Sequence, residues 1–153
     1  MSTPDTVTKL PAKPQWWRDV RAPFAGLLAL YVLVGLGSLG FDRRPTQLLL
    51  ILGTSLVTDA LFNRWYRGRA WAFPWSGLIS GLGLCLLLNV GTSPWLAILP
   101  AFVGIAAKQL VTFKGRHVYN PSMVGVVVGV ILGGGMVSPA PAYQWGGSLA
   151  MTL

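Results

Sequence analysis

The segment 113–122 (FKGRHVYNPS) carries the residue types best suited to bind a ligand. Lys114, Arg116 and His117 lie just before Asn120, which is followed by proline, and this pair is typical of a helix N-cap and first helical position. A helix N-terminus offers unpaired N–H groups and a partial positive charge, to which neighbouring cations add. The segment therefore predicts a site for a flavin phosphate, an anion in a quinone pocket or an acidic lipid. The alternative is an ordinary cytoplasmic anchor with a good cap.

Asp59 and Lys108 are ionisable residues inside long apolar runs. Such residues within membrane spans are functional-site hypotheses by default. Both are expected within about a turn and a half of one membrane face, where lysine can snorkel and aspartate can pair with a neighbouring cation. An Asp59–Lys108 pair at matching depth is one structural reading, and a functional role is the other.

Catalytic and metal-binding patterns are not found. His117 is the one histidine and Cys85 the one cysteine, so no metal site, catalytic triad or internal disulfide is expected. Residues 35–40 match GxGxxG, but they end an apolar helix instead of following a strand, and helix packing explains them better. A non-catalytic role is therefore favoured.

The composition indicates an integral membrane protein. Of 153 residues, 53% are hydrophobic and 10% charged, whereas soluble domains carry about 25% charged residues. The formal net charge is +8, but the cations flank apolar runs and form no basic stripe, which argues against nucleic-acid binding.

Five apolar runs predict an all-α bundle of about five transmembrane helices. The runs cover residues 22–41, 47–62, 76–90, 95–113 and 121–137. A helix needs about 20 residues to cross the hydrocarbon, so the second, third and fifth are short. Glycine-bearing short spans are typical of transporter-like broken helices, and slight bilayer thinning is the alternative.

The distribution of Lys and Arg sets the expected orientation, with the N-terminus in the cytoplasm of a bacterial inner-membrane protein. Nine cations precede the first, third and fifth runs, which places them on one face of the membrane. Two cations lie on the opposite face. The nine are Lys9, Lys13, Arg18, Arg21, Arg64, Arg67, Arg69, Lys114 and Arg116, and the two are Arg43 and Arg44. The chain is thus expected to divide into a disordered or interfacial cytoplasmic tail (1–20), a five-span membrane domain (21–137) and a periplasmic Pro/Gly-rich segment (138–153).

Glycines at four-residue spacing mark the helix faces expected to pack closely. Gly77 and Gly81 lie in the third run, and Gly125, Gly129 and Gly133 lie in the fifth. Helices in lipid associate by close backbone approach at small residues. These two runs are expected at the centre of a bundle or at a subunit interface.

Three segments resemble one membrane-protein family: SGLISGLGLCLLLN (76–89), AAKQL (106–110) and GRHVYNPSMVG (115–125). They are similar to the integral membrane family that contains the D-type component of Rnf electron-transport complexes and the B-type component of the sodium-translocating NADH:quinone oxidoreductase. We call it the Rnf/Nqr-like family. Its pattern has Phe-Asn-Pro-Ala where this chain has Tyr-Asn-Pro-Ser. The resemblance covers about residues 20–137, and it is most specific in the last third.

The resemblance implies a membrane subunit that scaffolds or lines a flavin, quinone or ion path. Family members have about ten spans in two halves, and this chain matches the first half. Their covalent flavin lies on a threonine in a Ser-Gly-Ala-Thr type motif that this sequence lacks, so any flavin or quinone is expected to be non-covalent. Expected partners are the lipid bilayer and other membrane subunits. The alternatives are a purely structural accessory subunit of a respiratory or photosynthetic complex, and a transporter half.

Overall fold

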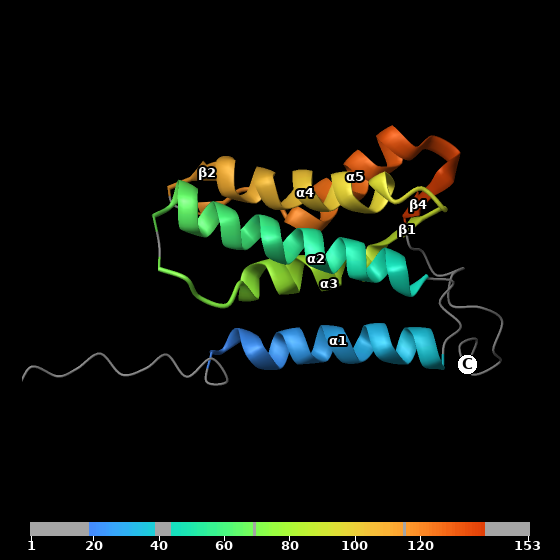
Figure 1. Ribbon diagram of the computed structural model, residues 1–153, viewed down its shortest axis with the longest axis horizontal. Coiled ribbons are helices and arrows are strands. Elements are labelled where there is room, and N and C mark those ends of the chain that lie inside the picture. The colour runs from blue at the N-terminus through green and yellow to red at the C-terminus, as the bar shows by residue number, and fades with distance from the viewer. Residues whose placement is uncertain (1–18, 39–43, 69, 115, 140–153) are drawn as a thin grey trace, which may run out of the picture.

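Over the residues that the structure describes, the protein is an all-α bundle, as the sequence predicts, in which five α-helices alternate in direction (Figure 1). The computed structural model describes residues 19–38, 44–68, 70–114 and 116–139. The helices are α1 (Arg21–Gly37), α2 (Pro45–Leu61), α3 (Trp75–Leu87), α4 (Trp95–Leu110) and α5 (Pro121–Gly133). Shorter elements are the π-helix η2 (Phe62–Tyr66), the 3₁₀-helix η3 (Gly134–Met136) and the strands β1 (Leu88–Val90), β2 (Thr112–Phe113), β3 (Arg116–His117) and β4 (Val137–Pro139).

The helices begin where the sequence supplies start signals. Proline occupies the first turn of α2 and of α5, where its missing N–H costs no hydrogen bond. Asn120 caps α5, since its Oδ1 accepts a hydrogen bond from the backbone N–H of Ser122 at 3.0 Å. At the other end of α5, Gly134 has φ +48°, a left-handed conformation that glycine adopts without steric cost.

Three helices, α3, α4 and α5, end before the apolar runs that contain them end. Helix α3 stops at Leu87 and α5 at Gly133, and the extended segments that follow them pair as β1 and β4, with Asn89 opposite Ser138. Helix α4 stops at Leu110, and a small hairpin of β2 and β3 follows. Backbone pairing satisfies groups that a helix would otherwise satisfy, so apolar residues can leave the helix here without losing hydrogen bonds.

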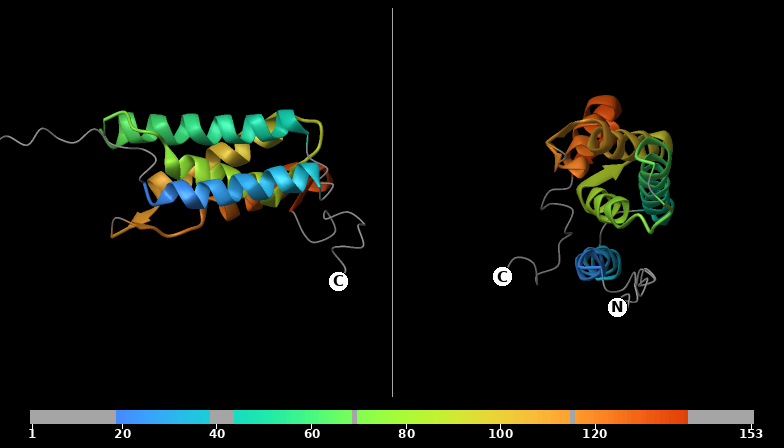
Figure 2. Two further views of the ribbon diagram at one scale, coloured as in Figure 1. Left: turned by 90° about the horizontal axis from the view of Figure 1, so that it is seen from below. Right: turned by 90° about the vertical axis from the view of Figure 1, so that its left-hand side faces the viewer.

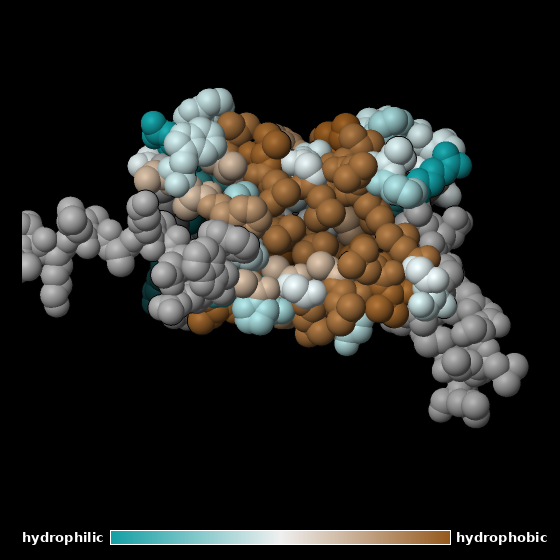
Figure 3. Space-filling view, turned by 60° about the horizontal axis from the view of Figure 1, so that its bottom comes forward, coloured by the Kyte–Doolittle hydropathy of each residue, from teal (hydrophilic) through white to brown (hydrophobic). Residues whose placement is uncertain are grey.

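Helices α2, α3, α4 and α5 form the packed centre, while α1 lies at the edge against α3 (Figures 1 and 2). The core contains Ile51, Leu84, Leu88 and Leu96, each no more than 2% exposed. Many large apolar side chains face outward, and in Figure 3 they form a brown zone between paler and teal ends. Among the described residues, one helical stretch, Pro45–Tyr66 with 22 residues, is long and apolar enough to cross a membrane, and the other apolar helices there are shorter than 18 residues.

Candidate functional site

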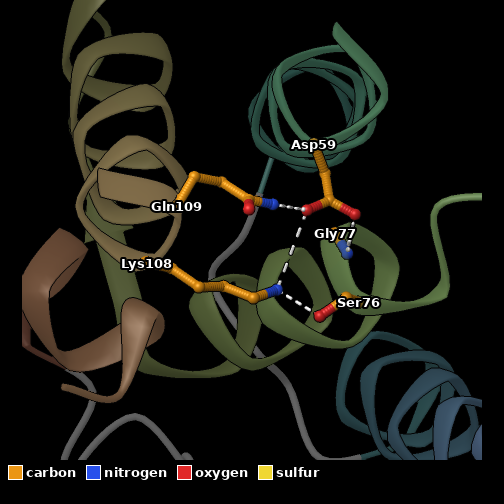
Figure 4. A network of polar contacts seen from close by, with 5 residues as sticks. All are labelled: Asp59, Ser76, Gly77, Lys108 and Gln109. Atoms are coloured by element: carbon orange, nitrogen blue, oxygen red, sulfur yellow. Dashed lines mark hydrogen bonds and ion pairs between the residues drawn. The ribbon is translucent and has the colours of Figure 1, made fainter. Parts of the chain in front are cut away.

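A buried polar network joins three helices near one end of the bundle (Figure 4). Asp59 on α2 is fully buried, and its Oδ2 accepts a hydrogen bond from the backbone N–H of Gly77 at 3.1 Å. Its Oδ1 accepts one from Gln109 Nε2 at 2.6 Å. Lys108 Nζ lies 3.8 Å from the same Oδ1 and donates to Ser76 Oγ. The carboxylate thus ties α2 to α4 and to the first turn of α3.

This network forms the inner wall of a cavity of about 350 Å³, which we call the basic cavity. Its charged and polar lining residues are Arg21, Arg64, Arg67, Lys108, His117, Asp19, Asp59, Asn63, Ser76 and Gln109. Its aromatic lining residues are Trp71, Phe73 and Trp75. Four cations, three arginines and one lysine, therefore face two carboxylates, which makes the cavity electropositive and favours an anionic ligand.

The π-helix η2 shapes one side of the basic cavity. The backbone N–H of Arg67 donates to the carbonyl of Phe62 at 3.1 Å, the five-residue step of a π-turn. π-turns inside helices are frequent at functional sites. Here the widened turn presents Asn63, Arg64 and Arg67 to the cavity, while Trp65 and Tyr66 are exposed.

Of the residues predicted to form an anion site in the 113–122 segment, Lys114 and His117 border one open depression, and Asn120 does not. His117 also lines the basic cavity, whereas Lys114 does not and lies over the Phe113 ring at 5.5 Å. Asn120 lines neither and serves as the cap of α5. The side chain of Arg116 lies outside the described part of the structure, as does all of Arg69.

The predicted packing glycines are buried at helix contacts. A Cβ on Gly77 would lie 2.7 Å from Asp59 Cβ, and one on Gly81 would lie 2.9 Å from Ser55 Cβ, so both lie against α2. A Cβ on Gly125 would lie 2.9 Å from the carbonyl oxygen of Pro100, and one on Gly129 would lie 3.0 Å from Leu88 Cδ1. A Cβ on Gly133 would meet Val137 of β4 first, and it would lie 3.3 Å from Leu96 Cδ2.

Several site residues carry only a weak signal in the sequence. Gln109 is uncharged, and its position beside Lys108 inside an apolar run is the one hint of its role. In the sequence, three arginines contribute only to the predicted orientation of the chain in a membrane. The fold brings them to one cavity from segments far apart, and they are Arg21, Arg64 and Arg67. Gly104, whose added Cβ would lie 2.5 Å from the carbonyl oxygen of Pro121, belongs to no glycine row in its own helix.

A second, smaller cavity of about 210 Å³ lies at the opposite end, where Arg44, Gln47, Asn89 and Met136 meet. Gln47 is 4% exposed and donates from Nε2 to the carbonyl of Leu88 at 3.1 Å. This bond satisfies backbone exposed where α3 gives way to β1. Gln47 thus has a structural role at the helix break.

Comparisons with protein-family models, with curated proteins and with solved structures find no match to this chain.

Proposed function

We propose that this chain is a multi-pass subunit of a bacterial inner-membrane complex, and that its basic cavity holds a flavin or quinone of an electron-transfer system. The observation that carries the proposal is the Asp59–Lys108–Gln109 network at the inner wall of the basic cavity. Buried charges in an otherwise apolar bundle are costly and tend to mark functional sites. An electropositive cavity beside them suits an anionic group.

The apolar surface supports a membrane location. Soluble monomers rarely expose contiguous apolar patches larger than a few hundred Å², yet exposed side chains here include Leu30, Leu33, Leu49, Val57 and Ile131. The short helix α3 is extended by the strand β1. At about 1.5 Å per helical residue and about 3.3 Å per strand residue, α3 and β1 together reach about 30 Å. That length equals the thickness of a typical hydrocarbon core.

The resemblance to the Rnf/Nqr-like family gains support from where its three segments lie. The first supplies Ser76 and Gly77, the second supplies Lys108 and Gln109, and the third supplies His117. All five residues belong to the network or line the basic cavity. Segments that share a family pattern and also meet at one cavity are better explained by a common site than by hydrophobicity alone.

A purely structural subunit is the second candidate. It is favoured by one observation, namely that both oxygens of Asp59 are hydrogen-bonded within the chain. The charges would then serve to join three helices, and the basic cavity would be a consequence of the cytoplasmic arginines.

The orientation can be tested by labelling single cysteines in a Cys85→Ser background. We expect a membrane-impermeant maleimide to reach Ala70→Cys from the cytoplasmic side and Thr92→Cys from the periplasmic side. Both positions are exposed, and Ala70 lines the basic cavity whereas Thr92 lines the smaller cavity at the opposite end. Labelling of both positions from the same side of intact cells would overturn the topology.

The function can be tested by purifying the tagged chain from native membranes in mild detergent. We expect co-purified membrane subunits together with flavin or quinone, detected by absorbance and by mass spectrometry after extraction. Co-purified subunits with no cofactor would favour the structural alternative. Recovery of the chain alone, without cofactor, would contradict both.

A further inference from the structure

We infer that the ligand of the basic cavity carries a phosphate monoester, held by the guanidinium groups of Arg21, Arg64 and Arg67. The inference rests on the proposed function in assigning a ligand to this cavity, and it goes further by naming the chemical group that is recognised. Phosphate monoesters occur both in soluble phosphorylated cofactors and in a lipid headgroup of the phosphatidic-acid type, and the two sources share the same recognition chemistry.

The charges of the cavity support a doubly charged anion. Lys108 and Asp59 lie 3.8 Å apart in a buried position and offset each other. Asp19 offsets one more cation, although its Oδ1 is already engaged by the backbone N–H of Arg21 at 3.0 Å. Two arginine charges remain uncompensated among the described lining residues. A phosphate monoester carries about −1.5 to −2 charges at pH 7, whereas a diester or a carboxylate carries about −1.

The type and placement of the cations also favour phosphate. Arg64 and Arg67 come from the π-turn and its end, and Arg21 comes from the start of α1, so two separate segments face one space. The planar guanidinium group presents paired N–H donors that match phosphate oxygens. All three side chains are exposed at the cavity, so they can rearrange around a ligand without disturbing the core.

The inner wall carries an acceptor that has no donor among the described residues. Gln109 is 4% exposed, its Nε2 is committed to Asp59, and its Oε1 is buried without a hydrogen-bond partner. An unsatisfied buried acceptor is unfavourable, so a ligand hydroxyl or N–H that reaches it gains affinity. Trp71 and Phe73 at the outer wall offer ring faces for a planar body. The cavity thus fits a phosphate monoester with a donor-bearing body.

The test measures binding of matched probes to the purified chain in lipid nanodiscs. The soluble pair is flavin mononucleotide and riboflavin, which differ by the phosphate, followed by flavin fluorescence. The lipid pair is phosphatidic acid and phosphatidylglycerol, a monoester and a diester, followed by native mass spectrometry. We expect the monoester of at least one pair to bind roughly tenfold or more tighter than its partner, the effect of one charge-assisted hydrogen bond.

The variant Arg64→Gln/Arg67→Gln should lower binding of the preferred monoester by at least about tenfold and leave riboflavin or phosphatidylglycerol unchanged. The matched controls are Arg44→Gln, at the opposite end, and Lys114→Gln, outside the basic cavity. They should change neither the affinity for the monoester nor the affinity for its partner probe. Circular dichroism and thermal melting verify that each variant is folded.

Selective binding of flavin mononucleotide identifies a soluble cofactor, and selective retention of phosphatidic acid identifies a lipid. Equal binding within both pairs, no binding of either monoester, or an unaltered affinity in the double arginine variant would overturn the inference. A cofactor that co-purifies with native membranes but lacks a phosphate would overturn it while leaving the proposed function standing. If the chain binds phosphate monoesters selectively but co-purifies with no cofactor and no partner, the inference stands and the proposed function is overturned.

Discussion

Asp59→Ala is expected to lower the free energy of unfolding by about 3–5 kcal/mol, the usual effect of removing one partner from a buried ion pair. The substitution leaves two donors, Gln109 Nε2 and the backbone N–H of Gly77, without their acceptor. It also leaves the buried ammonium group of Lys108 without its counter-ion. Because Asp59 is 0% exposed, these groups lose their partner in a desolvated part of the protein. The measurement is thermal or denaturant unfolding of the purified chain in detergent.

Ser55→Ala is the matched control for Asp59→Ala. Ser55 lies one turn earlier on the same helix and is 1% exposed, but its Oγ has no hydrogen-bond partner among the described residues. Its removal should be neutral or slightly stabilising. A double variant, Asp59→Asn/Lys108→Met, should regain part of the stability lost in the single variants, since no unpaired charge remains. If Asp59→Ala and Ser55→Ala unfold alike, the network does not join the helices in the way described.

The helices themselves can be predicted from the sequence, because apolar runs and start signals are local. The Asn-Pro pair places the start of α5, and the alternation of cations and apolar runs matches the alternating direction of the helices. These features depend on residues within a few positions of each other. They are therefore visible without any knowledge of the packing.

The ends of α3 and α5 could not be predicted, because their cause is not local. Leu88–Val90 continues an apolar run that is compatible with a helix, and it becomes a strand by pairing with Val137–Pro139, about fifty residues later. Gln47, from a third element, completes the break through its bond to the carbonyl of Leu88. Tertiary context overrides local preference here, as it commonly does for short apolar segments.

The candidate site shows the same division between local and non-local information. Asp59 and Lys108 are visible as charges in apolar runs, and their pairing is one reading of the sequence that the structure confirms. The cavity beside them could not be predicted, because Arg21, Arg64 and His117 come from three regions that meet only in the folded chain. A count of charges along the sequence leads to a predicted orientation of the chain in a membrane. It does not predict that those charges converge on one cavity.

Gly104→Ala is expected to destabilise the bundle by about 1–3 kcal/mol, the usual cost of overpacking, with the upper end favoured. The added Cβ would lie 2.5 Å from the carbonyl oxygen of Pro121, and 3.3 Å from the backbone nitrogen of Gly125. Both neighbours are backbone atoms of α5, so neither can rotate away, and the two helices must separate. Because Pro121 also opens α5, the shift would disturb the Asn120 cap.

Gly53→Ala provides the matched control for Gly104→Ala. Gly53 lies in the middle of α2, and a Cβ there would meet no atom within 4 Å. Alanine in a helix interior is favoured over glycine by about 0.5–1 kcal/mol, so this variant should be stabilised. Opposite shifts of the melting temperature in the two variants, measured in the same detergent, would support close packing of α4 on α5. Stabilisation of both would mean that Gly104 faces open space, and the contact between α4 and α5 would have to be redrawn.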